Sequence, residues 1–371
     1  MKKLVILHFG PLEWYPPVQN VVQVLAGEPF FDRIVVITTH SQSYLPLFSL
    51  SSERVVIHRL GYSGGRMNKL KRLFYYGWFY LVSLWLLLKT RPAQVLYFET
   101  LSSWPAYIYK RFFFRNCRIF IHYHEYVTPQ EYNRGMKLLS YFHRLEQWLY
   151  PQAVWVSHTN TDRMNFFKQD IAPVKIGQSN ILPNYPPKSW LSPPRETGRP
   201  LKFVYVGALS LDTMFTREFA RWVVRWKDQV QWDIYSYNKS ADIDGYFRQL
   251  NAVNISLLPG VSYQSLPAIL IKYDVGVILY NGHIANYVYN VPNKLFEYVA
   301  CGLDVWFPQQ LVSTLPYQTQ SSYPQIIPLD FLSLDEIDPQ KLSNRQGLSS
   351  RQDYYFCEEA IKPLIQKLIS A

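Results

Sequence analysis

The sequence contains few cysteines, a modest number of charges and no apolar segment of transmembrane length. Its cysteines, Cys117, Cys301 and Cys357, are odd in number and far apart, which argues against a disulfide framework and against a zinc site. The apolar run at residues 74–88 is shorter than the about 20 residues that cross a bilayer. Hydrophobic residues make up 48% of the chain and charged residues 18%, so a folded globular protein is expected.

Nucleic-acid-binding motifs are also missing. The net charge of +11 favours an anionic partner, and an aromatic content of 17% beside it is the composition of many nucleic-acid binders. However, the chain has no dense Lys/Arg tract, no zinc-ligand spacing and no RNP-type motif. We therefore expect no nucleic-acid partner. Nucleotides, phosphates and acidic membrane surfaces fit the same charge.

The amino terminus resembles a signal peptide only at first sight. Residues 1–9 combine two lysines with an apolar run, but the run is too short and Gly10 follows at once. We interpret residues 3–9 as a buried first strand and expect a cytoplasmic protein. Peripheral association with the inner face of the cell membrane is left open.

Strands and helices alternate along the chain, which is typical of doubly wound parallel sheets. Proline-rich residues 181–200 interrupt the alternation, and the same pattern then starts again. This predicts an α/β fold of two Rossmann-like parallel-sheet domains that face an interdomain cleft. The predicted parts are an N-terminal domain at 1–182, a hinge at 183–200, a second domain at 201–350 and a terminal helix at 351–371 that could pack back on the first domain.

The individual elements are predicted as follows. Strands are expected at residues 3–9, 33–39, 54–60, 94–98, 118–123, 153–157, 201–206, 231–235, 255–258, 275–279 and 304–307. Helices are expected at residues 18–25, 74–88, 136–149, 216–226, 266–272, 290–301 and 352–369.

Residues 289–306 form the segment on which the functional interpretation depends. Asn290 and Pro292 suit the start of a short helix, and Gly302 suits a left-handed end. Free amides at the helix start, together with Lys294, would suit a phosphate, and Glu297 one turn later would suit a ribose diol. An ordinary amphipathic helix with a solvated Lys/Glu pair explains the same residues equally well.

Two further candidate positions lie after predicted strands, where open α/β sheets bind their ligands. Gly10 follows the first strand, and His124 and Glu125 follow the strand at 118–123. His124 could serve in acid/base chemistry or in hydrogen bonding. A plain connecting turn at Gly10 and a structural role for His124 are the competing interpretations.

Two basic and aromatic segments, residues 64–91 and 110–118, have the composition of an interfacial membrane contact. A core helix of the first domain explains residues 74–88 as well. The two interpretations are compatible if one helix face packs and the other meets lipid.

The order of motifs resembles a GT-B glycosyltransferase, closest to glycosyltransferase family 4 of bacterial cell-surface polysaccharide synthesis. The most specific block is Asn-Lys-Leu-Phe-Glu-Tyr-Val-Ala-Cys-Gly-Leu-Asp-Val at 293–305. The other blocks are Ile-His-Tyr-His-Glu at 121–125, Val-Ser-His at 156–158, Asn-Ile-Leu-Pro-Asn at 180–184, Val-Tyr-Val-Gly-Ala-Leu-Ser at 204–210, Leu-Leu-Pro-Gly at 257–260 and Tyr-Asp-Val-Gly at 273–276.

This resemblance implies a nucleotide-sugar donor held mainly by the second domain, with no metal or other cofactor. Glu297 matches the family's ribose-binding glutamate, and Asn293 and Lys294 would lie near the diphosphate and the sugar. Gly207 would let the backbone approach the diphosphate, and His124 would lie near the reacting sugar from the acceptor side. The implied catalytic residues are His124, Lys294 and Glu125, the residue after His124.

The sequence departs from the family pattern at several positions. Tyr289 replaces the first glutamate of the paired-glutamate motif, which leaves the identity of the sugar open. Ala208 and Thr213 stand where the family has Arg and Lys, so Arg217 is the expected substitute cation for the diphosphate. Asp304 replaces a proline, which is a minor change.

The leading hypothesis is a glycosyltransferase that moves a sugar from a UDP- or GDP-sugar to a hydroxyl of a membrane-linked glycan or lipid, with retention of configuration. The alternative is a catalytically inactive GT-B protein that acts as a binding or scaffold subunit. A nucleotide-dependent dehydrogenase is a third class, and the absence of a Gly-x-Gly-x-x-Gly turn after the first strand counts against it.

Overall fold

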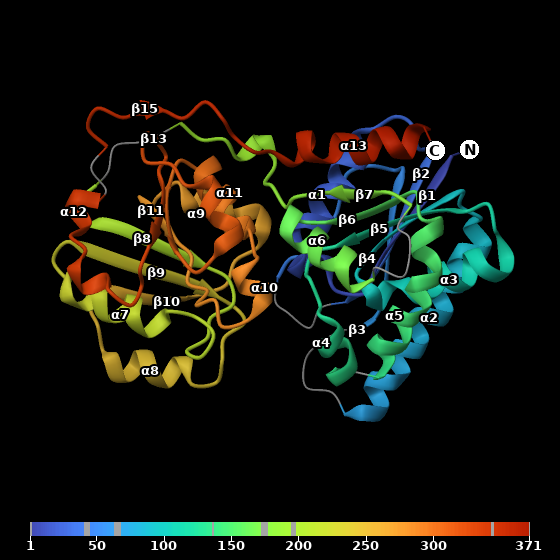
Figure 1. The fold of residues 1–371 in the computed structure, drawn as a ribbon, viewed down its shortest axis with the longest axis horizontal. Coiled ribbons are helices and arrows are strands. Elements are labelled where there is room, and N and C mark those ends of the chain that lie inside the picture. Colours follow the sequence, from blue (N-terminus) through green and yellow to red (C-terminus); the bar gives the residue numbers. More distant parts are fainter. Residues whose placement is uncertain are drawn as a thin grey trace. The chain divides into compact units, whose positions relative to one another are not determined.

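The chain forms two compact α/β units, each built on one parallel sheet (Figure 1). The computed structural model describes residues 2–40, 45–62, 68–135, 137–171, 177–193, 198–342 and 345–370. Unit 1 comprises Met1–Asn184 and Cys357–Ala371, and unit 2 comprises Tyr185–Phe356. The prediction of two Rossmann-like parallel-sheet domains is confirmed.

Unit 1 has a seven-stranded sheet in the order β3-β2-β1-β4-β5-β6-β7. Its strands are β1 (Lys3–His8), β2 (Arg33–His40), β3 (Val55–Tyr62), β4 (Gln94–Phe98), β5 (Arg118–Tyr123), β6 (Trp155–His158) and β7 (Ser179–Ile181). Its helices are α1 (Pro16–Gly27), α2 (Lys69–Thr90), α3 (Ser103–Ile108), α4 (Pro129–Arg134), α5 (Lys137–Leu149), α6 (Thr161–Asp170) and α13 (Cys357–Ser370), with a π-helical turn at Tyr109–Phe113.

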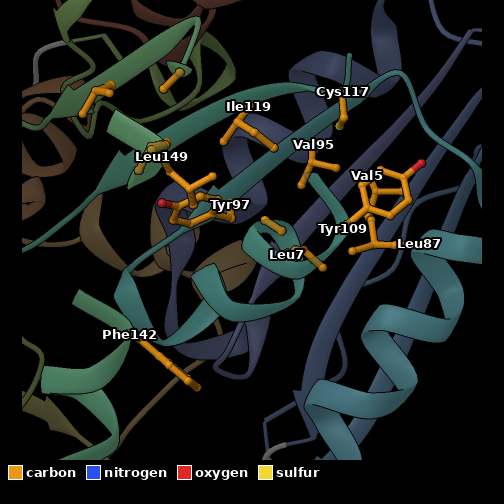
Figure 2. Packing of buried hydrophobic residues seen from close by; sticks show 14 of the residues in the cluster. Val5, Leu7, Leu87, Val95, Tyr97, Tyr109, Cys117, Ile119, Phe142 and Leu149 are labelled. Carbon is orange, nitrogen blue, oxygen red and sulfur yellow. The ribbon is translucent and has the colours of Figure 1, made fainter. Parts of the chain in front are cut away.

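Both faces of this sheet are buried, because alternate residues of each strand point to opposite sides. In β1, Val5 and Leu7 face the core that includes Leu87 of α2, as Figure 2 shows. Their neighbours Leu4 and Ile6 face a second core that is lined by α1 and α13. The continuous apolar run that predicted a buried strand is therefore explained by helices on both sides.

The carboxyl-terminal helix α13 is part of unit 1. It lies along α1 in Figure 1, and Leu364 and Leu368 are fully buried in the same core. The Gln94 side chain also donates a 2.7 Å hydrogen bond to the Leu368 carbonyl. The helix begins at Cys357 and not at residue 352, because Tyr355 packs against Phe296 of unit 2, with ring centroids 5.2 Å apart.

Unit 2 has a six-stranded parallel sheet in the order β10-β9-β8-β11-β12-β14. Its strands are β8 (Leu201–Val206), β9 (Val230–Ser236), β10 (Ile255–Pro259), β11 (Val275–Val277), β12 (Asp304–Pro308) and β14 (Ile326–Leu329), and β13 (Ser322–Tyr323) pairs separately with β15 (Ser349–Ser350). Its helices are α7 (Thr216–Arg225), α8 (Ile243–Leu250), α9 (Leu266–Leu270), α10 (Ala285–Val288), α11 (Asn293–Ala300) and α12 (Pro339–Leu342).

The proline-rich segment expected as a hinge at 183–200 is anchored in unit 2 over most of its described length. Trp190 is buried, and its ring lies 4.6 Å from that of Tyr263. The Ser192 amide donates to the carbonyl of Ala300, the last residue of α11. Residues 194–197 lie outside the described part of the chain.

Every strand predicted from the sequence is present, with ends shifted by a few residues. The prediction missed the short strands β7, β13, β14 and β15 and the helices α3, α4, α6, α8, α10 and α12. Met136, the predicted start of the helix at 136–149, lies outside the described residues, as do residues 64–67 of the first basic segment. Within the described residues, none of the helices combines the length and apolarity needed to cross a bilayer.

A tyrosine of α11 fills a space that a glycine of the neighbouring strand leaves open. A Cβ atom on Gly276 of β11 would lie 2.1 Å from the ring of Tyr298. The fully buried Tyr298 also accepts a 3.1 Å hydrogen bond from the Val206 amide at the end of β8. These two contacts fix α11 against the carboxyl end of β8.

We therefore expect Gly276→Ala to destabilise unit 2 by about 1–3 kcal/mol, because the added methyl group overlaps a ring that has no room to move. The measurement is the urea midpoint of unfolding. Gly245→Ala is the matched control: it lies in α8 with open space around its Cβ position, so it should stabilise the protein by about 0.5–1 kcal/mol. Equal midpoints for the two variants would contradict the packing argument.

Candidate functional site

Helix α11 starts at Asn293, later than the Asn290 cap that we predicted. Pro292 holds the cap position in an extended conformation without a side-chain cap, and proline disfavours helix in the residue before it. The Asn290 amide instead completes the preceding turn by bonding to the Tyr287 carbonyl. Among the described residues, the amides of Asn293 and Lys294 have no acceptor, so they are available to an anion.

The other end of α11 agrees with the sequence analysis. Gly302 has a φ of +80°, and its amide donates to the Val299 carbonyl at 3.1 Å. The Leu303 amide bonds to the Tyr298 carbonyl at 3.0 Å, which completes a Schellman cap. The short helix is therefore closed at its carboxyl end and open at its amino end.

Lys294 and Glu297 form an ion pair in the first turns of α11. The Lys294 Nζ lies 2.8 Å from Oε2 of Glu297. The Glu297 side chain is 1% exposed, whereas the Lys294 side chain is 21% exposed. The helix thus presents a partly exposed cation backed by a buried carboxylate, and not the solvated Lys/Glu pair of the competing interpretation.

The loop after β8 comes close to this ion pair. Gly207 has a φ of +144°, a conformation that favours glycine, and a Cβ atom there would lie 4.0 Å from Cε of Lys294. The sheet order reverses between β8 and β11, so this loop lies at the switch point where open α/β sheets bind ligands. The structure therefore brings together Gly207, Asn293, Lys294 and Glu297 at one edge of unit 2.

Arg217 lies on α7, the helix that follows the loop after β8. It is exposed in the first turn of α7, and its guanidinium lies 5.1 Å from the ring centroid of Tyr246 in α8. None of the interactions described for Arg217 joins it to Lys294 or Glu297. Its expected role as a cation for the diphosphate stays a prediction.

A second group of polar residues lies at the switch point of unit 1, between β1 and β4. Gly10 follows β1, and a Cβ atom on it would lie 2.8 Å from the ring of Tyr15. That ring lies 6.4 Å from the ring of His124, which follows β5. Gly10 and His124 therefore share one edge of the sheet, as their positions after strands suggested.

Glu99 is a residue of this edge that the sequence analysis missed. It directly follows β4. Its backbone has a φ of +63° and a ψ of +151°, which is a strained conformation for a residue other than glycine. Its carboxylate accepts a 2.6 Å hydrogen bond from the His124 amide, and the Glu125 amide also donates to it. Burial, with the nearby charge of Glu125, raises the pKa of Glu99 to about 8. Its position after the strand at 94–98 was the available signal.

His124 lies in a cluster of buried imidazoles at the ends of β1, β5 and β6. Its ring stacks on Phe98, with centroids 5.4 Å apart, and meets the edge of His122 at 4.6 Å. Burial lowers the pKa of His124 to about 4 and that of His158 to about 3, and it holds the pKa of His8 well below its usual range. These rings are neutral at pH 7, which favours hydrogen bonding by His124 over proton transfer.

The side chain of Glu125 is exposed, in contrast to that of His124. Its backbone amide contributes to the site by bonding to the Glu99 carboxylate. Across the described residues, no three His, Cys, Asp or Glu side chains are grouped so that they could hold a metal ion.

Solved structures with the same architecture cover the whole chain. HepE from Anabaena, in complex with UDP-glucose, aligns with a TM-score of 0.69 at 10% identity over 100% of both chains. Sucrose-phosphate synthase from Thermosynechococcus elongatus aligns with a TM-score of 0.65 at 15% identity, over 100% of this chain and 95% of that one. The chain has the GT-B fold.

The GT-B architecture also occurs in a putative UDP-N-acetylglucosamine 2-epimerase from Listeria monocytogenes, with a TM-score of 0.63 at 12% identity over 100% of this chain and 96% of that one. No protein-family model matches the sequence, and no curated protein sequence does either. At these identities the GT-B fold is established, whereas membership of glycosyltransferase family 4 stays a prediction.

The raised pKa of Glu99 predicts a pH-dependent effect of Glu99→Gln. The folded protein keeps the Glu99 carboxyl group protonated up to about pH 8, whereas the unfolded chain loses this proton near the ordinary pKa of 4.5. The free energy of unfolding of the wild type therefore falls as the pH rises between these values. Glutamine keeps an acceptor for the His124 amide and has no charge to bury. Urea unfolding should therefore show a gain in stability for the variant that is larger at pH 8 than at pH 5. A difference that does not change with pH would contradict the assigned pKa.

Proposed function

We propose that this protein is a glycosyltransferase that moves a sugar from a UDP- or GDP-sugar to a hydroxyl of a membrane-linked glycan or lipid, with retention of configuration. The observation that carries the proposal is the open amino end of α11, where Lys294 is backed by the buried Glu297 beside Gly207. HepE binds UDP-glucose in its solved complex, which supports a nucleotide-sugar donor.

The proposed donor site assigns one function to each group at this edge. The diphosphate accepts hydrogen bonds from the free amides of Asn293 and Lys294 and faces the Lys294 ammonium, while the Glu297 carboxylate accepts from the ribose hydroxyls. Gly207 lets the backbone approach without a side chain in between. As the bond from the anomeric carbon to the diphosphate oxygen breaks, these groups stabilise the negative charge on the leaving group. The proposal includes no metal and no other cofactor.

The acceptor hydroxyl is assigned to the Glu99–His124 edge of unit 1. A neutral imidazole and a carboxyl group with a pKa of about 8 can each donate or accept a hydrogen bond to a sugar hydroxyl at neutral pH. In the proposed reaction the hydroxyl oxygen bonds to the anomeric carbon on the face that the diphosphate leaves. Its proton passes to the leaving diphosphate. The exposed Glu125 carboxylate is available to the same acceptor.

The competing proposal is an inactive GT-B protein that binds a nucleotide-sugar or a partner without transfer. Tyr289 in place of the first paired glutamate, together with Ala208 and Thr213, favours it.

Donor binding tests the site assignment. Glu297→Ala should weaken the binding of UDP or GDP about 10- to 100-fold, because charged hydrogen bonds contribute about 1.5–3 kcal/mol each. Calorimetric titration of each nucleotide measures the change. Glu359→Ala is the matched control, since Glu359 also forms an i,i+3 ion pair, with Lys362 on the exposed side of α13. Equal affinities of wild type and Glu297→Ala would overturn the donor site.

A measurement of turnover distinguishes a glycosyltransferase from an inactive binding protein. We expect slow release of free sugar from UDP- or GDP-sugars by the purified chain, loss of this release in Lys294→Ala, and a first-formed sugar anomer that keeps the donor's configuration. Proton NMR of the reaction mixture measures all three. Nucleotide binding without turnover would support the scaffold function, and conversion of UDP-N-acetylglucosamine to its 2-epimer would replace transfer by epimerisation.

A further inference from the structure

The outer side of helix α2 exposes a row of large apolar side chains. The exposed fractions are 80% for Leu70, 64% for Phe74, 49% for Trp78, 65% for Leu81 and 55% for Trp85. Steps of three and four residues keep these side chains on one side of the helix. We call these five residues the α2 stripe. Patches of this kind on a folded protein usually mark an interaction surface.

The opposite side of α2 holds the helix in unit 1. Phe79 and Leu87 are fully buried, and Leu86 is nearly so, in the core that also contains Val5 and Leu7 of β1 (Figure 2). Folding of unit 1 therefore uses the inner side of α2 and leaves the α2 stripe unused. The core-helix and surface-contact interpretations of residues 74–88 are compatible in this geometry.

The amino end of α2 carries exposed cations where folding alone does not favour them. Lys69, Lys71 and Arg72 lie in the first turn, at the positive end of the helix dipole, where cations are unfavourable. Within Lys69–Thr90 there is no aspartate or glutamate to pair with them. These exposed charges are therefore available to an anion outside the unit.

Cations lie beside aromatic rings near both ends of the same helix. The Lys71 Nζ lies 5.8 Å from the ring centroid of Tyr75, and the Lys89 Nζ lies 4.9 Å from that of Trp85. Lys89 is at the carboxyl end, so cations flank the apolar residues of the stripe at both ends. This is the arrangement of a helix that rests in the boundary between lipid headgroups and acyl chains.

We propose that the outer side of α2 docks on an anionic lipid surface, with the α2 stripe entering the acyl boundary and the cations at both ends of the helix at the headgroup phosphates. An apolar protein groove would leave the exposed cations unexplained, and a nucleic acid would leave the apolar row unexplained. A lipid layer satisfies both features. This inference does not depend on the donor site, although it would bring the protein to a membrane-linked acceptor.

The second predicted membrane segment, residues 110–118, contributes less than its composition suggested. The Lys110 amine is used internally, since it donates to two backbone carbonyls at 2.9 and 2.7 Å. The Arg111 guanidinium lies 4.8 Å from the ring of Trp148. Phe112 and Phe113 are exposed, but the described contacts give no direction for them relative to the α2 stripe. The proposal therefore rests on α2 alone.

Vesicle flotation with the full chain tests this proposal. We expect binding to phosphatidylcholine vesicles that contain phosphatidylglycerol, weaker binding at high salt, and little binding to phosphatidylcholine alone. Alanine at Lys69, Lys71 and Arg72 together should lower the affinity about 100-fold, from about fivefold for each cation. Leu81→Asp should reduce binding at every salt concentration, because it places a carboxylate in the apolar row.

The controls are matched to each change. Alanine at Lys227, Arg248 and Lys272, which are exposed on unit 2, removes the same charge and should leave vesicle binding close to wild type. Val253→Asp is the control for Leu81→Asp, since Val253 is 93% exposed. Each stripe variant should keep the wild-type melting temperature and its nucleotide-induced shift, which separates loss of membrane docking from loss of the donor site.

Tryptophan fluorescence of the wild type reports contact with lipid directly. Brominated phosphatidylglycerol should quench part of the tryptophan fluorescence, and this part should disappear when Trp78→Phe and Trp85→Phe are combined. Equal vesicle binding by the wild type, the triple alanine variant and Leu81→Asp would overturn the proposal. Binding that does not need anionic lipid would also overturn it. A solution dimer that Leu81→Asp dissociates would do the same, because it would assign the α2 stripe to a second copy of the chain.

Discussion

The position of helix α11 depends on one contact, between Tyr298 and the bare backbone of Gly276. Because the strand offers no Cβ there, the ring reaches the sheet and its hydroxyl accepts the Val206 amide at the end of β8. The amino end of α11 and the loop at Gly207 are thereby fixed beside each other. Lys294 lies in the first turn of α11 and can then approach Gly207 while it remains paired with the buried Glu297.

The corresponding edge of unit 1 is built from neutral groups. Desolvation keeps His8, His124 and His158 uncharged at pH 7, and it raises the pKa of Glu99 to about 8. The strained backbone of Glu99 directs its carboxylate to the amide of His124. Such an edge suits hydroxyl groups, whereas the edge of unit 2, with a cation and free amides, suits an anion. The two edges therefore differ in chemical character, although the two sheets reverse their strand order in the same way.

Helix α2 has two sides of different character. Its inner side completes the core around Leu87, and its outer side combines exposed Trp78 and Leu81 with exposed cations. The sequence left both interpretations of this helix open, because periodicity reports that a helix has an apolar side without reporting which side is covered. Only the exposed fractions distinguish a buried aromatic such as Phe79 from an exposed one such as Phe74.

The sequence by itself determined the two parallel sheets and the left-handed end of α11 at Gly302, since apolar runs, turn glycines and prolines act through local backbone physics. It also pointed to Lys294 and Glu297 on one helix. The strained Glu99 and the turn of Arg217 toward Tyr246 were decided by tertiary structure. The reason is that burial, pKa shifts and side-chain partners arise between segments far apart in the chain, and no local pattern records them.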